Sequence, residues 1–498
     1  MVFFKAINSR KVIMFVSIII PILYSSCTKL DEEQKENILA KVGDKTISLK
    51  EFMRRAEYTI RPQYCKGNNN IDKKIILNSL LAEKMLALEA EKDSSLVENR
   101  TFQNQIKGHQ EQAMRKWLLK QEGFQKVKLE QSEIQKSYKL AGREYKIQYI
   151  RIPDKQAAKK VEEEIRINNK SFETFYRELW GEDSIPERTI SWQSKANPII
   201  HNALFSDYLN TGRIIGPLKI DEDNYILLKI LGWSDNLALT EKSRQQRLND
   251  VKKRLGDKKA YDNYSVFVNK IMKGKKLEFN SNTFYKMVNL IKPFYEKTPK
   301  EKQEMFLKNI SNGDDQNPEF NEFKTEFERL LDEPFFKVQG IQWSVKDFMN
   351  ELQKYPMLFP KNIKSKNSFA EKFKMTIVKM IEDKYVTQEA YKRGYQNTSF
   401  VKQRTQLWKD AILARHQKNK YLKNKIYTIS DSIRADTLFN KYLNPYINEL
   451  QEKYSDQVSV NVEKFNNLTL SKIDMIVTQR NVPFKKVVPD FLILTTDY

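Results

Sequence analysis

The segment AKVGDKTISLKEFM, residues 40–53, has the pattern of a β-hairpin followed by a helix. β-Prone residues flank the pair Gly43-Asp44, a pair that favours a tight turn. Ser48 then stands where a helix begins, and Glu51 three residues later completes the signature of a capping box. The segment therefore predicts a strand, a turn, a second strand and a helix, starting at Ile38.

The same pattern occurs again in the second half of the chain, as FKVQGIQWSVKDFM over residues 336–349. The two segments align without a gap, and LLAEKMLALEA (80–90) then aligns with MIEDKYVTQEA (380–390). A long helical segment with a Trp follows in both places. Chance similarity between helical patterns is the alternative, but an ungapped match in one structural context favours duplication of a domain. Six aligned positions of the hairpin and helix are identical: Lys41, Val42, Ser48, Lys50, Phe52 and Met53 in the first copy, and Lys337, Val338, Ser344, Lys346, Phe348 and Met349 in the second.

The rest of the chain is divided around these copies. Residues 38–142 and 335–430 are expected to form the two helical copies, and residues 236–334, rich in Lys, a helical connector. Residues 143–235 predict a small α/β domain, because an alternating strand is followed by two helices, a strand, a helix and two strands. Residues 431–498 predict a helix, a short strand and an apolar tail that docks on another part of the protein or on a partner. The predicted fold class is α+β and predominantly helical.

The first 27 residues have the layout of an export signal. A positive region and an apolar run end in two serines before Cys27, which is typical of a secretory signal peptide and resembles the lipobox of bacterial lipoproteins. We therefore expect residues 1–27 to be a lipoprotein signal, Cys27 to be acylated, and the polar residues 28–37 to be a tether. A transmembrane anchor is the alternative, but the run is shorter than about 20 residues and Pro21 interrupts it.

The composition indicates the class of partner. The chain has 87 Lys and Arg against 64 Asp and Glu, a net charge of +23. Such a surface attracts anionic membranes, nucleic acid or acidic polypeptides. Since an exported protein seldom meets nucleic acid, we expect lipid head groups and acidic client chains, with no nucleic acid and no small-molecule substrate.

Metal and cofactor chemistry has little support in the sequence. The three His residues, His109, His201 and His416, lie far apart, and the chain has two Cys, so we expect no metal site. No phosphate-binding loop or nucleophile motif is present, so we expect no cofactor. Cys65, the one thiol besides Cys27, is expected to be an inert core or loop residue.

The order of these parts resembles the periplasmic foldases of the SurA and PrsA type. In that family a chaperone domain opens with a strand, turn and helix like KVGDKTISLKEF, continues with a helix like LLAEKMLALEA, and is followed by a parvulin-like prolyl isomerase domain. The segments YKIQYIRI, SFETFYREL, NALFSDYLNTGRIIGPLKI and NYILLKI resemble parvulin segments in the same order. The resemblance covers about residues 38–280, and residues 335–465 as a second, partial copy. It implies a duplicated chaperone domain with an inserted parvulin-like domain.

The chain departs from the parvulin pattern where active members carry two His residues. Tyr149 and Ile226 occupy those positions, and Trp192 alone persists from the glycine-rich turn. We identify Tyr149, Trp192, Phe205 and Tyr225 as a candidate peptide-binding pocket, with ordinary domain core as the alternative for the walls Trp192, Phe205 and Tyr225. Because isomerisation is accelerated by polar groups that favour the twisted amide, this pocket is expected to bind with little or no catalysis.

These inferences together predict an exported, membrane-anchored foldase or chaperone for unfolded or assembling envelope proteins. We expect it in the cell envelope, lipid-anchored at the outer membrane and facing the periplasm, with exposure at the cell surface as the other option. Two alternatives remain open: an active prolyl isomerase with a non-standard pocket, and a structural lipoprotein of an envelope assembly.

Overall fold

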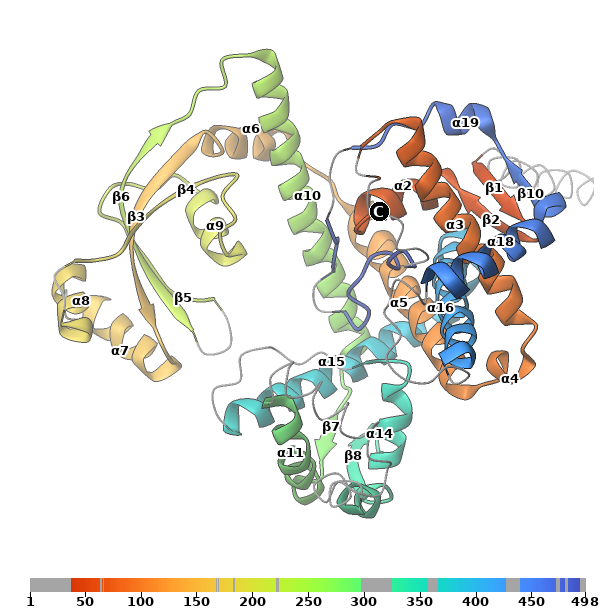
Figure 1. Ribbon diagram of the computed structural model, residues 1–498. Coiled ribbons are helices and arrows are strands. Elements are labelled where there is room, and N and C mark those ends of the chain that lie inside the picture. The colour runs from red at the N-terminus through yellow and green to blue at the C-terminus, as the bar shows by residue number, and fades with distance from the viewer. Residues whose placement is uncertain are drawn as a thin grey trace, which may run out of the picture. The chain divides into compact units, whose positions relative to one another are not determined.

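The computed structural model describes residues 37–492 except 63–64, 66, 167, 169, 182–183, 221–223, 297–324, 357–365, 427–438, 472–474 and 480–481. The expected signal segment, Cys27 and the tether up to residue 36 lie outside the described residues. The chain divides into two compact units: unit 2 is Leu118–Lys270, and unit 1 takes in the residues before and after it. Long helices and small antiparallel sheets make up both units (Figure 1), which confirms the α+β, predominantly helical class. Within the described ranges, no helix combines the length and apolar character that a membrane span requires.

The first repeat in unit 1 forms the elements that the sequence predicts. β1 (Ile38–Val42) and β2 (Lys45–Ser48) pair antiparallel, and the helices α2 (Leu49–Tyr58) and α3 (Asn70–Glu91) follow. Ser48 Oγ accepts a hydrogen bond of 3.0 Å from the Glu51 N–H. The Glu51 carboxylate pairs with Lys84 at 2.9 Å instead of returning to Ser48. Only half of the predicted capping box is therefore formed here.

The second repeat has the same succession of elements. β8 (Pro334–Val338) and β9 (Ile341–Ser344) form the hairpin, and α14 (Val345–Leu352) and α15 (Lys366–Lys392) follow. The capping box is complete in this copy, because Ser344 Oγ accepts from the Asp347 N–H at 3.1 Å and the Asp347 carboxylate accepts from the Ser344 N–H at 2.9 Å. The predicted repeat of hairpin, capped helix and long helix is thus present in both halves of the chain.

A third strand completes each hairpin. The short strand within residues 431–498 was predicted from the sequence, but its pairing with the first hairpin and the strand before the second hairpin were not. β10 (Val458–Val460) pairs with β1 so that Val460 faces Ala40, and β7 (Leu277–Phe279) pairs with β8 so that Phe279 faces Phe336. Since Ala40 and Phe336 are aligned positions of the repeat, the two pairings have the same register. The third strand follows its repeat in the first copy and precedes it in the second.

Each third strand leads into an Asn-capped helix with a buried Phe. Asn461 Oδ1 accepts from the Lys464 N–H at the start of α19 (Val462–Asn466), and Asn280 Oδ1 accepts from the Thr283 N–H at the start of α11 (Ser281–Glu296). Phe465 and Phe284 follow the Asn by four residues and enter the two cores. This corrects two expectations: residues 236–334, expected to be a helical connector, contain the strand β7, and the short strand expected within residues 431–498, SVNVEKF at 459–465, is a strand only up to Val460 and continues as the helix α19.

The long helix of the second repeat packs against the first copy. α16 (Ser399–Ile426) lies along α3 and brings Leu413, Ala414 and Leu422 into the first core (Figure 1). The corresponding α5 (Arg100–Leu118) contributes Phe102 to that same core. A helix of the second predicted copy, residues 335–430, is therefore part of the core of the first copy, residues 38–142. Short α4 (Ser94–Val97) and α18 (Asn444–Lys453) and brief 3₁₀ or π turns at 119–123, 124–126, 395–397, 439–443 and 455–457 complete the described helices.

The contact between α3 and α16 contains buried charges. Asp410 of α16 is 1% exposed and accepts from Lys84 at 2.8 Å and from Lys45 at 2.9 Å. Beside it, Arg55 makes a two-pronged hydrogen bond to Glu83 at 2.7 and 2.8 Å. The described part of the apolar tail docks nearby, since Val488 and Leu492 are buried, and residues 493–498 lie outside the described residues. Charges this deep require partners, so each group depends on the others for its position.

Unit 2 is a four-stranded antiparallel sheet covered by helices on both faces. The strand order is β4-β3-β6-β5, with every neighbouring pair antiparallel. α7 and α8 cover one face and α9 covers the other (Figure 1), while α6 and α10 flank the sheet in sequence and add Ile134 and Val251 to the α9 side. The elements are α6 (Gln131–Leu140), β3 (Arg143–Ile152), α7 (Lys155–Arg166), α8 (Phe172–Trp180), β4 (Glu187–Ser191), α9 (Pro198–Phe205), β5 (Ile214–Lys219), β6 (Tyr225–Asp235) and α10 (Glu241–Met272).

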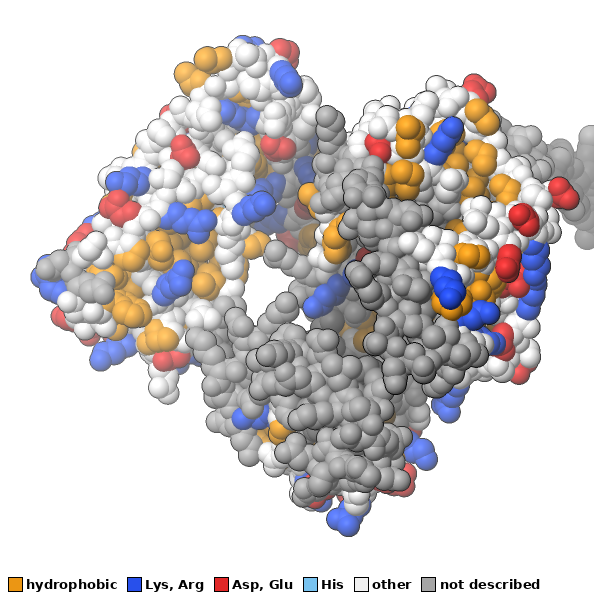
Figure 2. Space-filling model, in the orientation of Figure 1, with side chains coloured by type: hydrophobic (Ala, Val, Ile, Leu, Met, Phe, Trp, Pro, Cys, Tyr) orange, Lys and Arg blue, Asp and Glu red, His pale blue; other side chains and the backbone are white. Residues whose placement is uncertain are grey.

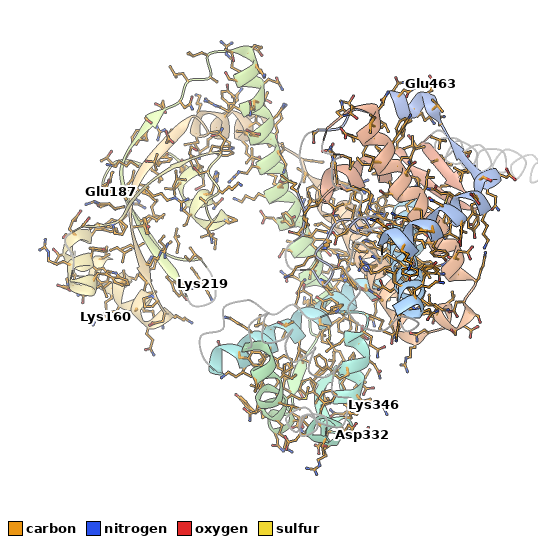
Figure 3. The ribbon with its side chains drawn as sticks, in the orientation of Figure 1. Lys160, Glu187, Lys219, Asp332, Lys346 and Glu463 are labelled. Carbon is orange, nitrogen blue, oxygen red and sulfur yellow. The ribbon has the colours of Figure 1, made fainter. Side chains whose placement is uncertain are left out.

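The edges of this sheet carry charged side chains. Glu187 lies on the edge strand β4 and Lys219 on the edge strand β5 (Figure 3), and both residues are exposed. Glu187 also pairs with Lys146 of β3 at 2.7 Å. Charged edge residues discourage the addition of a further strand, so peptide binding is better sought on a face of this sheet than at its edge.

Candidate functional site

The candidate pocket lies on the face of the unit 2 sheet that α9 covers. Tyr149, Trp192, Phe205 and Ile226 all belong to this one apolar cluster. The Trp192 and Phe205 rings meet edge to face, with centroids 5.4 Å apart and planes at 80°. Trp192 and Phe205 are each 4% exposed. Their rings thus form the floor of the site, and a bound peptide would touch the residues around them.

The two positions where parvulins carry His are neighbours on this face. Tyr149 of β3 pairs across the sheet with Leu228, two residues from Ile226 on β6, so Tyr149 and Ile226 form a diagonal pair. Tyr149 is half-buried, and the Arg151 guanidinium lies 5.9 Å from the centroid of its ring. The Tyr hydroxyl can donate and accept a hydrogen bond, whereas Ile has no polar side-chain atom. The pair can therefore offer a peptide an aromatic ring, one hydroxyl and a methyl surface.

Tyr225 does not lie with the other predicted pocket residues. Its side chain packs in the cluster between the opposite sheet face and the helices α7 and α8, together with Ile152 and Phe172. The reason is the alternation of a strand, in which neighbours such as Tyr225 and Ile226 point to opposite faces. The sequence-based pocket must be corrected to Tyr149, Trp192 and Phe205, with Ile226 beside them.

His201 belongs to the floor of the site, although the sequence did not single it out for this role. The residue lies on α9 and is 3% exposed, with its ring centroid 4.9 Å from Trp192 and 4.5 Å from Phe205. Burial, aided by the nearby Arg254 charge, lowers the pKa of His201 to about 4. The neutral ring is 3.0 Å from the Trp192 carbonyl, to which Nε2–H donates. His201 therefore joins α9 to the end of β4. The sequence did contain a signal for this burial, because His201 stands in a helical segment with the apolar residues Ile200, Leu204 and Phe205.

The rim of the site is apolar and includes a close approach between two strands. Ile215, Leu218 and Ile220 are partly buried beside the floor residues, and Figure 2 shows hydrophobic side chains gathered over α9 and β5. Gly216 has φ +112°, and a Cβ at this position would lie 2.7 Å from the Ile226 carbonyl oxygen. Glycine is therefore required at this position, where β5 lies close against β6. The side chains packed around this floor form an apolar surface.

The remaining sequence candidates lie elsewhere. Cys27 is outside the described residues, and Cys65 is buried in unit 1. His109 is stacked between Trp408 and Phe484 at centroid distances of 4.2 and 3.8 Å, also in unit 1. In the part of the chain that the structure describes, no three His, Cys, Asp or Glu side chains are grouped in a way that could hold a metal ion.

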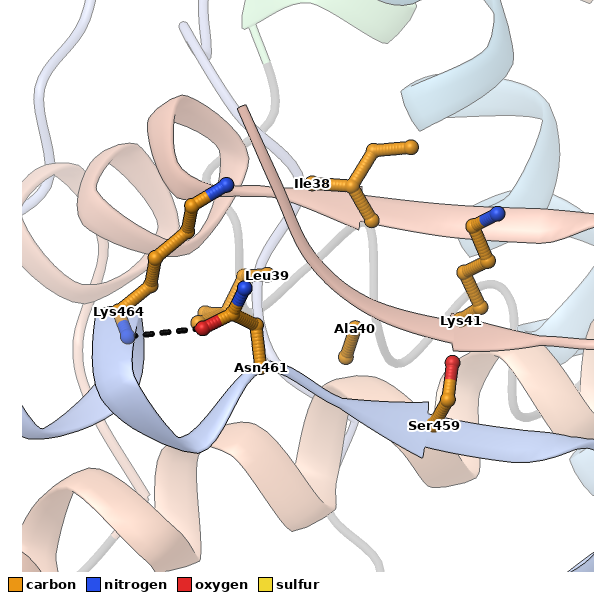
Figure 4. Close-up of a pocket in the computed structure, with 7 residues that line it drawn as sticks. All are labelled: Ile38, Leu39, Ala40, Lys41, Ser459, Asn461 and Lys464. Carbon is orange, nitrogen blue, oxygen red and sulfur yellow. Dashed lines mark hydrogen bonds between the residues drawn. The ribbon is translucent and has the colours of Figure 1, made fainter. Parts of the chain in front are cut away.

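A surface pocket of about 330 Å³ lies in unit 1 along the pairing of β1 with β10 (Figure 4). Its polar lining comes from Ser459, Asn461 and the two cations Lys41 and Lys464. Asn461 already caps α19, so its side-chain oxygen is engaged in holding the helix. The pocket has the shape of a groove beside a short edge strand and no arrangement of groups for catalysis.

Comparisons with known proteins give little further information. No protein-family model matches the chain, and no curated protein sequence matches it significantly. Among solved structures, the chain is similar to the foldase protein PrsA from Streptococcus pneumoniae, with 15% identity and a TM-score of 0.19. That match covers 45% of this chain and 89% of the PrsA chain.

Proposed function

We propose that the protein is an exported, membrane-anchored chaperone of the foldase type, whose unit 2 binds unfolded segments without accelerating proline isomerisation. The observation that carries the proposal is the diagonal pair Tyr149 and Ile226 beside the Trp192 and Phe205 floor. This face offers apolar contacts to an extended chain. Ile226, the diagonal partner of Tyr149, has no polar side-chain atom that could favour a twisted amide.

A face of this kind does not favour the twisted transition state of proline isomerisation over the planar peptide bond. The barrier to rotation about a peptide bond is about 18–20 kcal/mol, and a catalyst must bind the twisted form more tightly than either planar isomer. Apolar walls contact the cis and trans forms similarly, so they give affinity but no rate enhancement. The anchor is supported by the order of residues before Cys27, and recruitment of acidic clients by the net charge of +23.

The direct test of binding is site-specific photocrosslinking in the full chain. A photoreactive phenylalanine analogue replaces Tyr149, and a control chain carries it at Tyr261, which is 58% exposed on α10. We expect an unfolded reporter protein to crosslink at position 149 well above position 261, and its native form to crosslink at neither. Equal yields at the two positions would contradict the proposal.

The anchor has its own test, independent of client binding. Cells are labelled with a palmitate analogue, and the wild-type chain is compared with Cys27→Ser. We expect the label on the wild-type chain alone. Incorporation into both chains would show that Cys27 is not the acylated residue. A structural lipoprotein of an assembly would instead retain one stoichiometric partner and give no crosslinks to unfolded reporters.

A further inference from the structure

The loop between β6 and α10 in unit 2 presents two leucines to solvent. Leu237 is 70% exposed and Leu239 is 76% exposed. Figure 2 shows hydrophobic side chains at this end of unit 2, over the loop that Figure 1 draws between β6 and α10. Isolated exposed apolar residues are common on proteins, so the two leucines need a second observation before they indicate a binding surface.

That observation is the way in which the loop is held. The Asn236 N–H donates to the Gly142 carbonyl at 2.7 Å, and Arg247 donates to the Asn236 carbonyl at 2.5 Å. Arg244 donates to the carbonyls of Ala238 and Leu239, both at 3.2 Å. Arginines of α10 thus bind three of the four backbone carbonyls of residues 236–239, and the turn before β3 binds one N–H. The loop is fixed by its backbone while its leucines point outward.

Two aromatic residues and a third arginine lie beside the loop. Trp233 is 37% exposed and Tyr208 is 49% exposed. The Arg143 guanidinium lies 4.3 Å from the Trp233 ring centroid and 4.9 Å from the Tyr208 ring centroid, and it donates to the Tyr145 hydroxyl at 3.3 Å. Among the described residues, no carboxylate pairs with Arg143 or with Arg247. We call Tyr208, Trp233, Leu237 and Leu239 the apolar tip.

We propose that the apolar tip inserts into the interfacial region of an anionic membrane. Trp and Tyr favour the level of the lipid head groups, and exposed leucines gain by entering the acyl boundary below them. Arg143 and Arg247, which form no ion pair with a described carboxylate, attract anionic head groups at the same level, while Arg244 pairs with Glu241 at 3.5 Å; the chain's net charge of +23 has the matching sign. The leucines protrude, and a protrusion fits a fluid bilayer without a preformed cavity. The proposed client site is the separate face at Tyr149.

This inference goes beyond the proposed function and does not depend on acylation of Cys27. The test uses the full chain with Cys27→Ser and an environment-sensitive fluorophore on Leu237→Cys. A matched chain carries the fluorophore on Val266→Cys, because Val266 is also 70% exposed but lies on α10. Cys65 is buried and does not compete for the label. Any attachment through the N-terminal segment is the same in both chains, so a difference reports the tip itself.

Vesicles of phosphatidylcholine with phosphatidylglycerol are added to both chains, and vesicles of phosphatidylcholine alone serve as the charge control. We expect a blue shift and quenching by nitroxide-labelled lipid at position 237, several-fold larger than at position 266 and weaker on the neutral vesicles. Adding Leu239→Asp should reduce the response at position 237 while circular dichroism is unchanged. Equal responses at 237 and 266, or a response to an unfolded protein and not to vesicles, would overturn the proposal. Failure here leaves the crosslinking result at Tyr149 unaffected, so the two proposals fail separately.

Discussion

The two copies of the hairpin and helix in unit 1 share a backbone plan but differ in what covers them. Both have the same strand register, a serine cap and a Phe that is 0% exposed, Phe52 in the first copy and Phe348 in the second. In the first copy, α16 lies along α3 and buries Lys84 to 1% exposure of its side chain. The aligned Lys384 of the second copy keeps 32% side-chain exposure and pairs with Glu351.

At one aligned position of a buried charge pair, the two copies carry opposite charges. Arg55 and Glu83 form a buried pair in the first copy, whereas the aligned residues of the second copy are Glu351 and Asp383, both acidic. Asp383 instead faces α5, where Arg115 lies 3.5 Å away. On α16 the residue that faces α3 is the anion Asp410. In the contact between α3 and α16, α3 supplies the cation Lys84 and α16 the anion Asp410. In the contact between α15 and α5 the signs are reversed, because α15 supplies the anion Asp383 and α5 the cation Arg115. This reversal favours α16 over α5 as the cover of α3.

The largest expected effect should be the same in both copies. Replacing Phe52 or Phe348 by Ala removes a fully buried ring and should cost about 3–5 kcal/mol in the free energy of opening of that copy. Hydrogen exchange on α3 and on α15, read in the full chain, measures each copy separately. A loss below about 1 kcal/mol in one copy would show that the repeat does not place its Phe equivalently.

A charge substitution should separate the copies. Glu83→Ala leaves Arg55 buried without its carboxylate and should cost about 3 kcal/mol in the first copy. Asp383→Ala should cost less, about 1–2 kcal/mol, because it leaves the Tyr355 hydroxyl without its 2.9 Å acceptor, whereas Arg115 keeps its bond to Thr387 at 2.8 Å and Lys379 its pair with Glu382. The same hydrogen-exchange measurement compares them. A greater loss for Asp383→Ala would reverse the stated difference between the copies.

Lowering the pH should reduce the stability of the first copy, because protonation removes the charge of its paired carboxylates. Burial opposes ionisation of Asp410, but Lys84 and Lys45 outweigh it and lower its pKa. Glu89, bound by Lys453, Lys92 and Tyr454, has its pKa lowered from 4.5 to about 2. A carboxyl with a lowered folded pKa stabilises above its unfolded value and loses that contribution as pH falls through the folded value. Protection of α3 should therefore decline between pH 4.5 and about 2. An unchanged decline in Asp410→Asn with Glu89→Gln would exclude these two groups as its cause.

The smallest expected effects come from the caps. Ser344→Ala breaks a complete capping box and should cost about 1 kcal/mol, while Ser48→Ala breaks one hydrogen bond and should cost less. Exchange of the first-turn amides of α14 and α2 measures these losses. If Ser48→Ala had the larger effect, the diversion of Glu51 to Lys84 would not have weakened the first cap.

The comparison also shows which features a sequence can predict. Hairpins, caps and amphipathic helices depend on neighbouring residues, so residues 40–53 were enough to predict their own structure. The third strands depend on partners far away in the chain, although the shared spacing from Asn461 to Phe465 and from Asn280 to Phe284 was a usable signal. The pairing of α16 with α3 was not predictable, because an apolar face shows that a helix is buried but not against which partner.

In the candidate site, too, local patterns could be predicted from the sequence and tertiary contacts could not. Strand alternation could have placed Tyr225 away from Tyr149, since the period of a strand is fixed. The role of His201 depends on its 3.0 Å contact with the Trp192 carbonyl, which is set by the packing of α9 on the sheet. Arginines of α10 bind the carbonyls of the loop at residues 236–239, so the conformation of this loop likewise depends on where α10 packs after β6. Such contacts are formed by the tertiary fold and leave no periodic pattern.

The proposed binding of extended segments by unit 2 without catalysis of proline isomerisation can be tested directly in solution. Exchange spectroscopy by NMR on peptides with several residues before the proline gives cis–trans rates with and without the full chain, in a preparation shown to crosslink unfolded protein at position 149. We expect peptide binding, seen as line broadening, with cis–trans exchange rates equal to those of the free peptide. Acceleration comparable to that of an ordinary parvulin would contradict it and would assign catalysis to a pocket formed by Tyr149 without the His pair.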